Sequence, residues 1–439
     1  MTWQEEFKKK TISADEAANF VKSGDCVVIS AREPHNLCLA LAARVGELKD
    51  IEIYGVAGGF DVGWYDAGWE GSFKIALNMP TAVSQAAFEE KRTDLIVGPL
   101  IPFSMAPANR DMDVFLVEIS TPDENGFCSF GNSAWDKKKR INEAKLAIGE
   151  MNSHFIRPCG SAAYVHISEL DYVVEHQSAG GTPGKGSLTG RALKPDEPYL
   201  QPIMENVRSL IKDGDTIQIG VGRTTERLVK LGLLEGKNDL GLHTEATMPG
   251  VIKAVRDGVI NGKYKTINRD KAVVTTVGGD TREEMNWVNQ NPLFEMVDVF
   301  YLEDIRVIAA HDNMVCINNI LGIDFTGQIG SETIGTRLIG PAGGQPPFAI
   351  AAQLSKGGRS ISIMPSTVGN GKTSRIMPFL PQGTVVTIPR TCTDYVVTEY
   401  GIAELRGRTA RQRAERLIAI AHPDHRDDLM KEARKQFWP

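Results

Sequence analysis

The chain has 439 residues, enough for two large domains or three modest ones at a usual size of about 150 residues per domain. Hydrophobic residues make up 42% and charged residues 24%, which excludes a disordered, collagen-like or coiled-coil chain. With 49 Lys and Arg against 55 Asp and Glu, the net charge is −6, so no overall positive field attracts nucleic acid or an anionic membrane. A polyanionic ligand therefore needs a local basic site.

The N-terminal segment, MTWQEEFKKK, is polar and unlike a signal peptide, and no segment approaches about 18 consecutive apolar residues. We therefore expect a cytoplasmic protein that binds neither nucleic acid nor a membrane. The six cysteines are scattered without a C-x-x-C pair, which favours free buried thiols over disulfides or a zinc ribbon. The tight pair His422-Pro-Asp-His425 offers too few ligands for a metal site, so we interpret it as a loop cap or structural turn.

In chain order, the two halves show the same series of predicted elements. A helical pattern over 14–22 leads through Gly24-Asp25 into an apolar strand over 26–29, and a second helix leads through Gly214-Asp215 into a strand over 216–219. Two more pairs of segments match further along: Asp50-Ile51-Glu52-Ile53 with Asp239-Leu240-Gly241-Leu242, and Asp113-Val114-Phe115 with Asp298-Val299-Phe300. The three offsets are 190, 189 and 185 residues (214 − 24, 239 − 50 and 298 − 113). This ordered series predicts a duplicated architecture, although Gly-Asp turns before strands are also common by chance.

Helix-period segments over 37–48 and 225–234 alternate with further short apolar strands over 94–97 and 272–277. This alternation predicts an α/β fold of two tandem, structurally similar open domains with largely parallel sheets. We place the domains at 1–200 and 201–439, beside a Gly/Pro-rich stretch at 178–198 that suits a passive connector or a lid. In such sheets, ligands bind outside the carboxyl ends of the strands.

Two sequence features follow predicted strands of the second half. Gly220-Val221-Gly222 opens a helix after the strand ending at Ile219, and it lacks the third glycine of a dinucleotide fingerprint, so we do not expect NAD. The next strand, expected over 238–244, runs into Glu245. A carboxylate after a strand, facing a glycine turn on the neighbouring strand, suits a nucleophile in an open α/β site. From spacing alone, a helix N-cap or a surface acid is the favoured interpretation of Glu245.

Longer motifs carry a resemblance over almost the whole chain. They are GVGRTT, LGLHTEATMPG, SKGGRSISIMPST, GKTSRIMPFLPQGTVVTIPRTCTDYVVTEYGIAELRGRTARQRAERLIAIAHPD and, in the first half, VEISTPDENGFCSFG and YVHISELDYVVE. With them the sequence resembles family I CoA-transferases, specifically the acetyl-CoA hydrolase/transferase and 4-hydroxybutyrate CoA-transferase group. The resemblance implies two tandem domains of the CoA-transferase fold. It also implies that the glutamate of the LG-x-H-[ST]-E motif, Glu245, is the catalytic nucleophile.

The implied activity is a ping-pong transfer of CoA between short-chain mono- or dicarboxylic acids through a thioester on Glu245. Coenzyme A then serves as a substrate, with no metal and no tightly bound cofactor. By resemblance, the backbone N–H of Val221 stabilises the oxyanion, and Gly220 and Gly222 permit the close approach of the substrate. The second glycine run, with Gly343 and Gly344, forms the other wall. For both runs a plain structural turn is the alternative.

The phosphates of CoA need local cations in an acidic protein. The side chains that match this need are Lys356, Arg359, Ser366, Lys372, Ser374 and Arg375. Each basic residue taken singly also fits a solvated surface charge. In the first half, Arg32 stands where the family usually shows a glycine-rich loop. We expect Arg32 in the acyl pocket, paired with the second carboxylate of a dicarboxylic acid, or else paired with a neighbouring acid for stability.

Three other functions remain open at this stage. The same glutamyl-CoA intermediate attacked by water would make the protein an acyl-CoA hydrolase, and sequence motifs do not separate the two. The segment Gly369-Asn370-Gly371-Lys372-Thr373 ends like a phosphate-binding P-loop, but Ser366 stands where its first glycine belongs. A catalytically silent CoA sensor is the third, and the presence of Glu245 argues against it. We expect a homo-oligomer.

Overall fold

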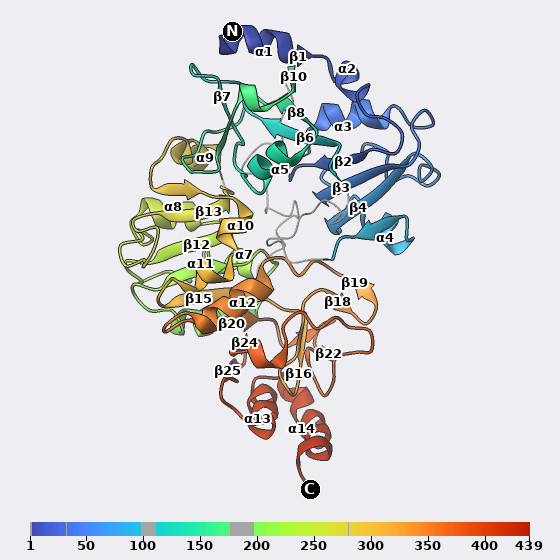
Figure 1. Ribbon diagram of the computed structural model, residues 1–439. Coiled ribbons are helices and arrows are strands. Elements are labelled where there is room, and N and C mark those ends of the chain that lie inside the picture. The colour runs from blue at the N-terminus through green and yellow to red at the C-terminus, as the bar shows by residue number, and fades with distance from the viewer. Residues whose placement is uncertain (1, 32, 98–110, 176–196, 280) are drawn as a thin grey trace. The chain divides into compact units, whose positions relative to one another are not determined.

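The structure is a computed structural model that describes residues 2–31, 33–97, 111–175, 197–279 and 281–439 (Figure 1). The chain divides into two compact units: unit 1 contains Met1–Thr182 and Asn286–Phe300, and unit 2 contains Pro183–Met285 and Tyr301–Pro439. Each unit is built on a largely parallel sheet, which confirms the predicted α/β fold. The limits 1–200 and 201–439 stay a prediction, and they do not include the return of residues 286–300 to unit 1. Among the described helices, none combines the length and the apolarity needed to cross a bilayer.

The sheet of unit 1 has the strand order β1-β10-β8-β6-β2-β3-β4-β5, and all of its neighbouring strands pair in parallel (Figure 1). Its elements are α1 (Trp3–Lys10), β1 (Thr11–Ile12), α2 (Ala14–Ala18), β2 (Cys26–Ile29), α3 (His35–Ala42), β3 (Ile51–Ala57), β4 (Phe73–Met79), α4 (Gln85–Glu89), β5 (Thr93–Leu95), β6 (Val114–Ile119), β7 (Phe127–Ser129), α5 (Lys137–Glu143), β8 (Leu146–Met151), β9 (Tyr164–His166), a 3-10 turn (Ile167–Glu169) and β10 (Tyr172–Glu175). Helices α9 (Arg282–Val288) and α10 (Val299–Leu302) straddle the unit boundaries, with β14 (Phe294–Met296) between them.

Within unit 2 the strands of the large sheet follow the order β13-β12-β11-β15-β20-β24-β25, parallel except for the edge strand β25. The elements are α6 (Leu200–Ser209), β11 (Thr216–Ile219), α7 (Thr225–Leu228), β12 (Gly241–Ala246), α8 (Val251–Arg256), β13 (Ala272–Thr276), α11 (Ile305–Ala309), β15 (Met314–Asn319), β16 (Gly322–Asp324), β17 (Ile329–Gly330), β18 (Thr333–Ile334), β19 (Arg337–Leu338), α12 (Gln345–Leu354), β20 (Arg359–Ile363), β21 (Thr367–Val368), β22 (Thr373–Ser374), β23 (Ile376–Met377), a 3-10 turn (Arg390–Cys392), β24 (Tyr395–Thr398), β25 (Gly401–Glu404), α13 (Ala410–Ala419) and α14 (Pro423–Phe437).

The predicted repeat is present down to its turns. Gly24 and Gly214 both have positive φ, 87° and 78°, which a glycine adopts without strain. In each turn the following aspartate accepts a hydrogen bond from the backbone N–H three residues earlier, at 2.8 Å for Asp25 and 2.7 Å for Asp215. Strands β2 and β11 have the predicted bounds. The first match between the halves is therefore structural rather than accidental.

The second and third matches have different outcomes. Asp50 and Asp239 both lie before their strands with φ of 55° and 56°, so this match is confirmed. The third is wrong, because Val299-Phe300 begins helix α10, and the strand beside β11 that corresponds to β6 beside β2 is β15. Val299 is apolar because it packs in a small core of unit 1 with Val56 and Trp135. Two apolar residues after an aspartate fit a strand and a buried helix start equally well.

Central strands of both sheets are buried on both faces, as parallel sheets covered by helices require. Every residue of β2, β6 and β11 is buried.

All six cysteines are free thiols; four of them are buried, whereas Cys159 and Cys392 are partly exposed. His422 caps the N-terminus of α14, where its side chain accepts from the backbone N–H of Asp424, which confirms the cap interpretation. Among the described residues, no group of three or more His, Cys, Asp or Glu side chains is arranged to hold a metal ion.

Candidate active site

Glu245 lies near the carboxyl end of strand β12 in unit 2. The strand extends to Ala246, so Glu245 is part of it rather than following it. Strand β12 pairs in parallel with β11, with Thr216 opposite Gly241, so the turn at Gly220 after β11 lies at the same edge of the sheet. This is the edge where open α/β sheets bind ligands.

Alternation along β12 decides what Glu245 faces. His243 and Glu245, two residues apart, project to one face, while Thr244 projects to the other and donates to the carbonyl of Ile219 at 3.2 Å. The Nε2 of buried His243 lies 2.6 Å from the carbonyl oxygen of Leu302. A carbonyl only accepts, so Nε2 carries the hydrogen and donates it. This bond fixes Leu302 against the face of β12 that carries Glu245.

The residue after Leu302 is a second acid, Glu303, whose side chain is 0% exposed. A methyl group on Gly344 would lie 2.6 Å from Oε1 of Glu303 and 3.3 Å from Oε2 of Glu245. The two carboxyl groups therefore both lie against Gly344, the N-cap residue of helix α12, and the absence of a side chain at Gly344 makes room for both.

Burial shifts the protonation of both acids. It raises the pKa of Glu245, and it raises the pKa of Glu303 still further because the charge of Glu245 adds to the desolvation. Two neighbouring carboxyl groups in a dry site do not both ionise, so the pair retains a proton at neutral pH. Burial raises the pKa of Glu245 to about 7 and that of Glu303 well above its ordinary value, so Glu303 keeps its proton and Glu245 is the group of the pair that ionises near neutral pH.

The glycine turn after β11 is closely packed on its inner side. A methyl group on Gly220 would lie 2.2 Å from Oδ1 of Asn318, and one on Gly222 would lie 3.0 Å from Cβ of Asn319. Val221 between them is 37% exposed, and no described residue accepts a hydrogen bond from its backbone N–H. The turn thus offers an unused N–H donor at the edge where Glu245 lies.

Similarity to known proteins decides the family. The chain is 37% identical to the 4-hydroxybutyrate coenzyme A transferase of Clostridium kluyveri over 443 residues, which cover 100% of both chains. The chain belongs to the acetyl-CoA hydrolase/transferase family. The family's N-terminal domain model matches residues 1–180, and its C-terminal domain model matches residues 281–433. This member of the family is a CoA-transferase.

Solved structures agree with this assignment. RipA from Yersinia pestis is similar with a TM-score of 0.88 at 30% identity, covering 100% of both chains. The 4-hydroxybutyrate CoA-transferase from Porphyromonas gingivalis is similar with a TM-score of 0.77 at 34% identity, covering 99% of this chain and 100% of the other. The fold of this family member is therefore the CoA-transferase fold.

Two of the predicted CoA contacts of this CoA-transferase lie at the other edge of the sheet. Lys356 and Arg359 precede or begin β20, at the amino ends of the parallel strands, whereas Glu245 lies at the carboxyl ends. Arg359 forms an ion pair with buried Asp215, and Lys356 is paired with Asp312 at 3.6 Å. The structure therefore does not bring Lys356 and Arg359 together with Glu245.

The other predicted contacts follow the carboxyl end of β20. Buried Ser366 donates through its backbone N–H and its hydroxyl group to Glu399, at 2.8 and 2.6 Å. The Ser374 hydroxyl donates to the carbonyl of Ile376 at 2.7 Å. Arg375 is partly buried, which lowers its pKa, and no described residue accepts from its buried Nε.

The segment resembling a P-loop, residues 369–373, forms the turn of the β21–β22 hairpin and enters β22. A phosphate-binding P-loop joins a strand to a helix, so the nucleotide-binding alternative loses its structural basis. Lys372 is exposed in this turn.

The second glycine run differs between its two glycines. Gly343, with φ of 56°, faces open space, unlike Gly344. Arg32 and most of the loop 178–198 lie outside the described residues.

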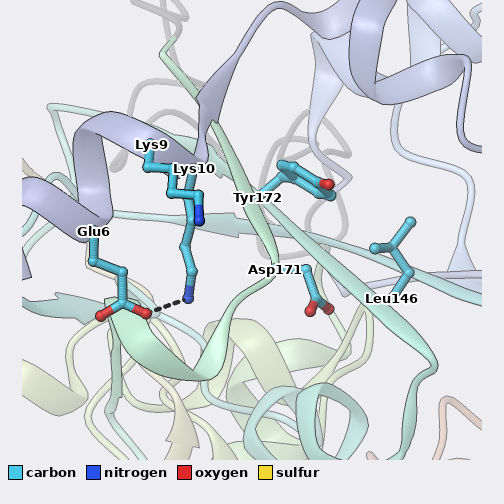
Figure 2. A pocket seen from close by; sticks show the side chains of 6 residues that line it. All are labelled: Glu6, Lys9, Lys10, Leu146, Asp171 and Tyr172. Carbon is cyan, nitrogen blue, oxygen red and sulfur yellow. Dashed lines mark ion pairs between the residues drawn. The ribbon is translucent and has the colours of Figure 1, made fainter. Parts of the chain in front are cut away.

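One pocket of about 360 Å³ lies in unit 1, and none of the predicted site residues is among those that line it. It is lined by Glu6, Lys9, Lys10, Leu146, Asp171 and Tyr172. Lys10 and Glu6 of helix α1 form an ion pair with an N–O distance of 2.7 Å. Figure 2 shows this pair together with Asp171 and Tyr172. The pocket lies at the amino ends of β8 and β10, the edge opposite to the one at which α/β sheets bind ligands.

Glu303 is the site residue that sequence reasoning missed. It stands in Tyr301-Leu302-Glu303-Asp304, directly before helix α11, and Asp304 caps that helix by accepting from the N–H of Arg306. Acids at helix starts are ordinary features of exposed caps. The sequence offers no signal that one of the two acids is buried, because that depends on the contact between Leu302 and β12.

Proposed function

We propose that the protein exchanges CoA between an acyl-CoA and a free carboxylic acid by a ping-pong reaction through a glutamyl-CoA thioester on Glu245. The observation that carries the proposal is the placement of the Glu245 carboxyl group. It lies at the ligand-binding edge of the sheet, beside the protonated acid Glu303, against Gly344. A carboxylate nucleophile conserves the energy of the thioester, because each intermediate is itself an anhydride or a thioester.

Each step of this exchange balances without an external acid or base. An ionised oxygen of Glu245 attacks the acyl carbonyl and releases CoA as a thiolate, leaving an acyl-glutamyl anhydride. The thiolate attacks the glutamyl carbonyl and releases the first acid, leaving the Glu245–CoA thioester. The acceptor carboxylate then repeats both steps in reverse.

The tetrahedral intermediates need donors for their oxyanions. The N–H of Val221 is available at the carboxyl edge, and we assign it this role, with Gly220 and Gly222 beside it and Gly343 and Gly344 as the second wall. Loss of one such donor costs about 3 to 4 kcal/mol in other acyl-transfer enzymes.

For CoA itself we propose contacts with residues that follow the carboxyl end of β20. These are Ser366, Lys372, Ser374 and Arg375, of which Arg375 has an unused buried donor. We do not assign this role to Lys356 and Arg359, because they lie at the opposite edge of the sheet, at the amino ends of its parallel strands. Coenzyme A thus acts as a substrate in the proposed reaction.

The proposed acids are short-chain mono- or dicarboxylic acids, in line with the 4-hydroxybutyrate named for two similar proteins. Arg32 stays the proposed partner of a second carboxylate, and an Arg32→Ala variant with unchanged relative rates for mono- and dicarboxylic acceptors would contradict this.

The family name also covers hydrolases. Free thiol released from acyl-CoA without an added carboxylate acceptor would favour hydrolysis. The cytoplasmic location and the homo-oligomer stay predictions.

Trapping the intermediate tests the proposal. After incubation with acyl-CoA, borohydride reduces a glutamyl-CoA thioester to an alcohol, and mass spectrometry should find the loss of mass on Glu245 alone. Glu245→Ala should abolish the label and lower kcat at least about a thousandfold, as loss of a nucleophile does. Glu235→Gln, at an exposed acid of the same unit, serves as the control. Full CoA-transferase activity in Glu245→Ala would contradict the proposal.

A further inference from the structure

The buried acid beside the nucleophile has a role that the exchange chemistry itself does not require. We propose that Glu303 is a positioning residue: its carboxylic acid donates a hydrogen bond to one carboxylate oxygen of Glu245 and leaves the other oxygen to attack the substrate. This inference rests on the proposed function, because it assumes that Glu245 is the nucleophile.

The geometry gives Glu303 a single partner. Its side chain is 0% exposed, and among the described residues no donor reaches either of its carboxyl oxygens. The carboxyl group of Glu245 lies at the same place, because a methyl group on Gly344 would be 2.6 Å from Oε1 of Glu303 and 3.3 Å from Oε2 of Glu245. An ionised carboxylate in this position would be buried without any compensating charge or donor, at a cost of several kcal/mol.

The other titratable groups packed around this place are turned elsewhere. From β12, His243 donates to Leu302, and from the end of α11 the ring of His311 lies against that of His243, with centroids 4.8 Å apart. Lys265 donates to the carbonyl groups of Leu242 and Lys271 at 2.8 and 2.9 Å. From α12, Gly344 contributes no side chain. Among the described residues, Glu245 is the charged neighbour that shifts the pKa of Glu303.

Protonation follows from this arrangement. Burial and the neighbouring charge raise the pKa of Glu303 well above its ordinary value. Burial lowers the pKa of His243 to about 3, so its ring is neutral at neutral pH. Burial lowers the pKa of Lys265 to about 7, and its ammonium group donates to the carbonyl groups of Leu242 and Lys271 rather than to Glu303. Glu303 is thus a neutral donor and Glu245 an ionised acceptor, a charge-assisted hydrogen bond.

The same donor serves the later steps of the reaction. When Glu245 carries CoA, its remaining oxygen is the thioester carbonyl, and a neutral Glu303 can polarise that carbonyl for attack. An ionised Glu303 would repel the developing oxyanion. The proton stays on Glu303 throughout, so the exchange still balances. The effect falls on the rate of the chemical steps and not on substrate binding.

Two variants of the full-length protein test whether the side chain at position 303 acts as a hydrogen-bond donor or only fills space. Glu303→Gln keeps an N–H donor of similar size, so it should retain kcat within about threefold, whereas Glu303→Leu should lose roughly tenfold to a hundredfold in kcat, the value of one hydrogen bond to a charged group. The KM values for acyl-CoA and acceptor should stay nearly constant in both. Asp394→Asn is the matched control, since Asp394 is also a buried acid with a raised pKa but lies before β24, at the amino ends of the strands.

A spectroscopic measurement covers the case in which Glu303→Leu does not fold. Infrared spectroscopy at neutral pH should show a protonated carboxylic acid in the wild-type protein that is lost in Glu303→Gln and kept in Asp394→Asn. Absence of that difference, or a folded Glu303→Leu with wild-type kcat, would overturn the inference. Borohydride labelling of Glu245 in the wild-type protein keeps the two proposals apart: without the label the proposed function fails, and with it only the role of Glu303 is in question.

Discussion

At the scale of single residues, the site depends on one glycine as much as on its acids. Gly344 is the place where Glu245 and Glu303 meet, although the three residues lie on three different elements or connections. A side chain at this position would collide with both acids, because its first carbon would lie 2.6 Å from Oε1 of Glu303 and 3.3 Å from Oε2 of Glu245. The glycine therefore leaves the space that the two carboxyl groups occupy.

Substituting this glycine should disturb chemistry more than stability. In Gly344→Ala the new methyl group would lie 2.6 Å from Oε1 of Glu303, so the pair must shift. We expect kcat to fall by roughly a hundredfold, since a displacement of about 1 Å at a reacting group has effects of this size. Steady-state kinetics and thermal unfolding check this. Gly71→Ala, where the added methyl group meets nothing within 4 Å, is the control, and equal kcat in both variants would contradict the expectation.

At the scale of elements, strand β12 organises the site through its alternation. His243 and Glu245 share one face, and the hydrogen bond from His243 to Leu302 holds the segment that carries Glu303. The arrangement requires neutral imidazoles, because burial lowers the pKa of His243 to about 3 and that of His311 to about 2. No described residue forms a hydrogen bond with either ring nitrogen of His311.

These histidines should make the protein sensitive to acid. In the unfolded chain they bind protons below about pH 6.5, whereas in the folded chain they stay neutral until about pH 3 or 2, so their contribution to stability is present above pH 6.5 and is lost as the pH falls. Each contributes a slope of up to roughly 1.4 kcal/mol per pH unit. His311→Phe should lose less free energy of unfolding between pH 7 and pH 5 than the wild-type protein. Urea unfolding at both values measures this, and an unchanged difference would refute it.

At the scale of the whole molecule, two units share one strand order but not one continuous boundary. In unit 1, β2 lies between β3 and β6, and in unit 2, β11 lies between β12 and β15. Residues 286–300 interrupt unit 2 in sequence, between Met285 and Tyr301, and belong to unit 1. There the backbone N–H of Met296 donates to Cys159 at 2.9 Å, and that of Val299 donates to Trp135 at 2.9 Å.

A core substitution in this returning segment should therefore weaken unit 1. Val299 is 1% exposed, and Val299→Ala removes two buried methyl groups, at a cost of roughly 1 to 3 kcal/mol. Hydrogen exchange should become faster in the unit 1 peptide spanning residues 130–143, around Trp135, and stay unchanged in β11 and β12. Faster exchange confined to unit 2 would show that the segment belongs there instead.

The sequence by itself determined the features that depend on neighbouring residues. The bounds of β2 and β11, the paired Gly-Asp turns and the α/β fold follow from apolar runs and turn chemistry, which act over a few residues. The family motifs singled out Glu245, and the structure places it at the edge where such a residue can act. The local sequence pattern wrongly predicted a strand at Val299-Phe300, where the two apolar residues begin a helix.

Only the tertiary structure decided which distant residues meet. Glu303 lies beside Glu245 because a histidine on one strand bonds to a carbonyl group just before another helix, and no local pattern encodes that contact. Likewise, Lys356 and Arg359 lie in a sequence stretch that resembles the family and were expected to contact CoA, but they lie at the amino ends of the strands, where each is paired with an acid. Burial and the edge of the sheet at which a side chain lies arise from packing between segments far apart in the chain, so they appear only once the sheet is formed.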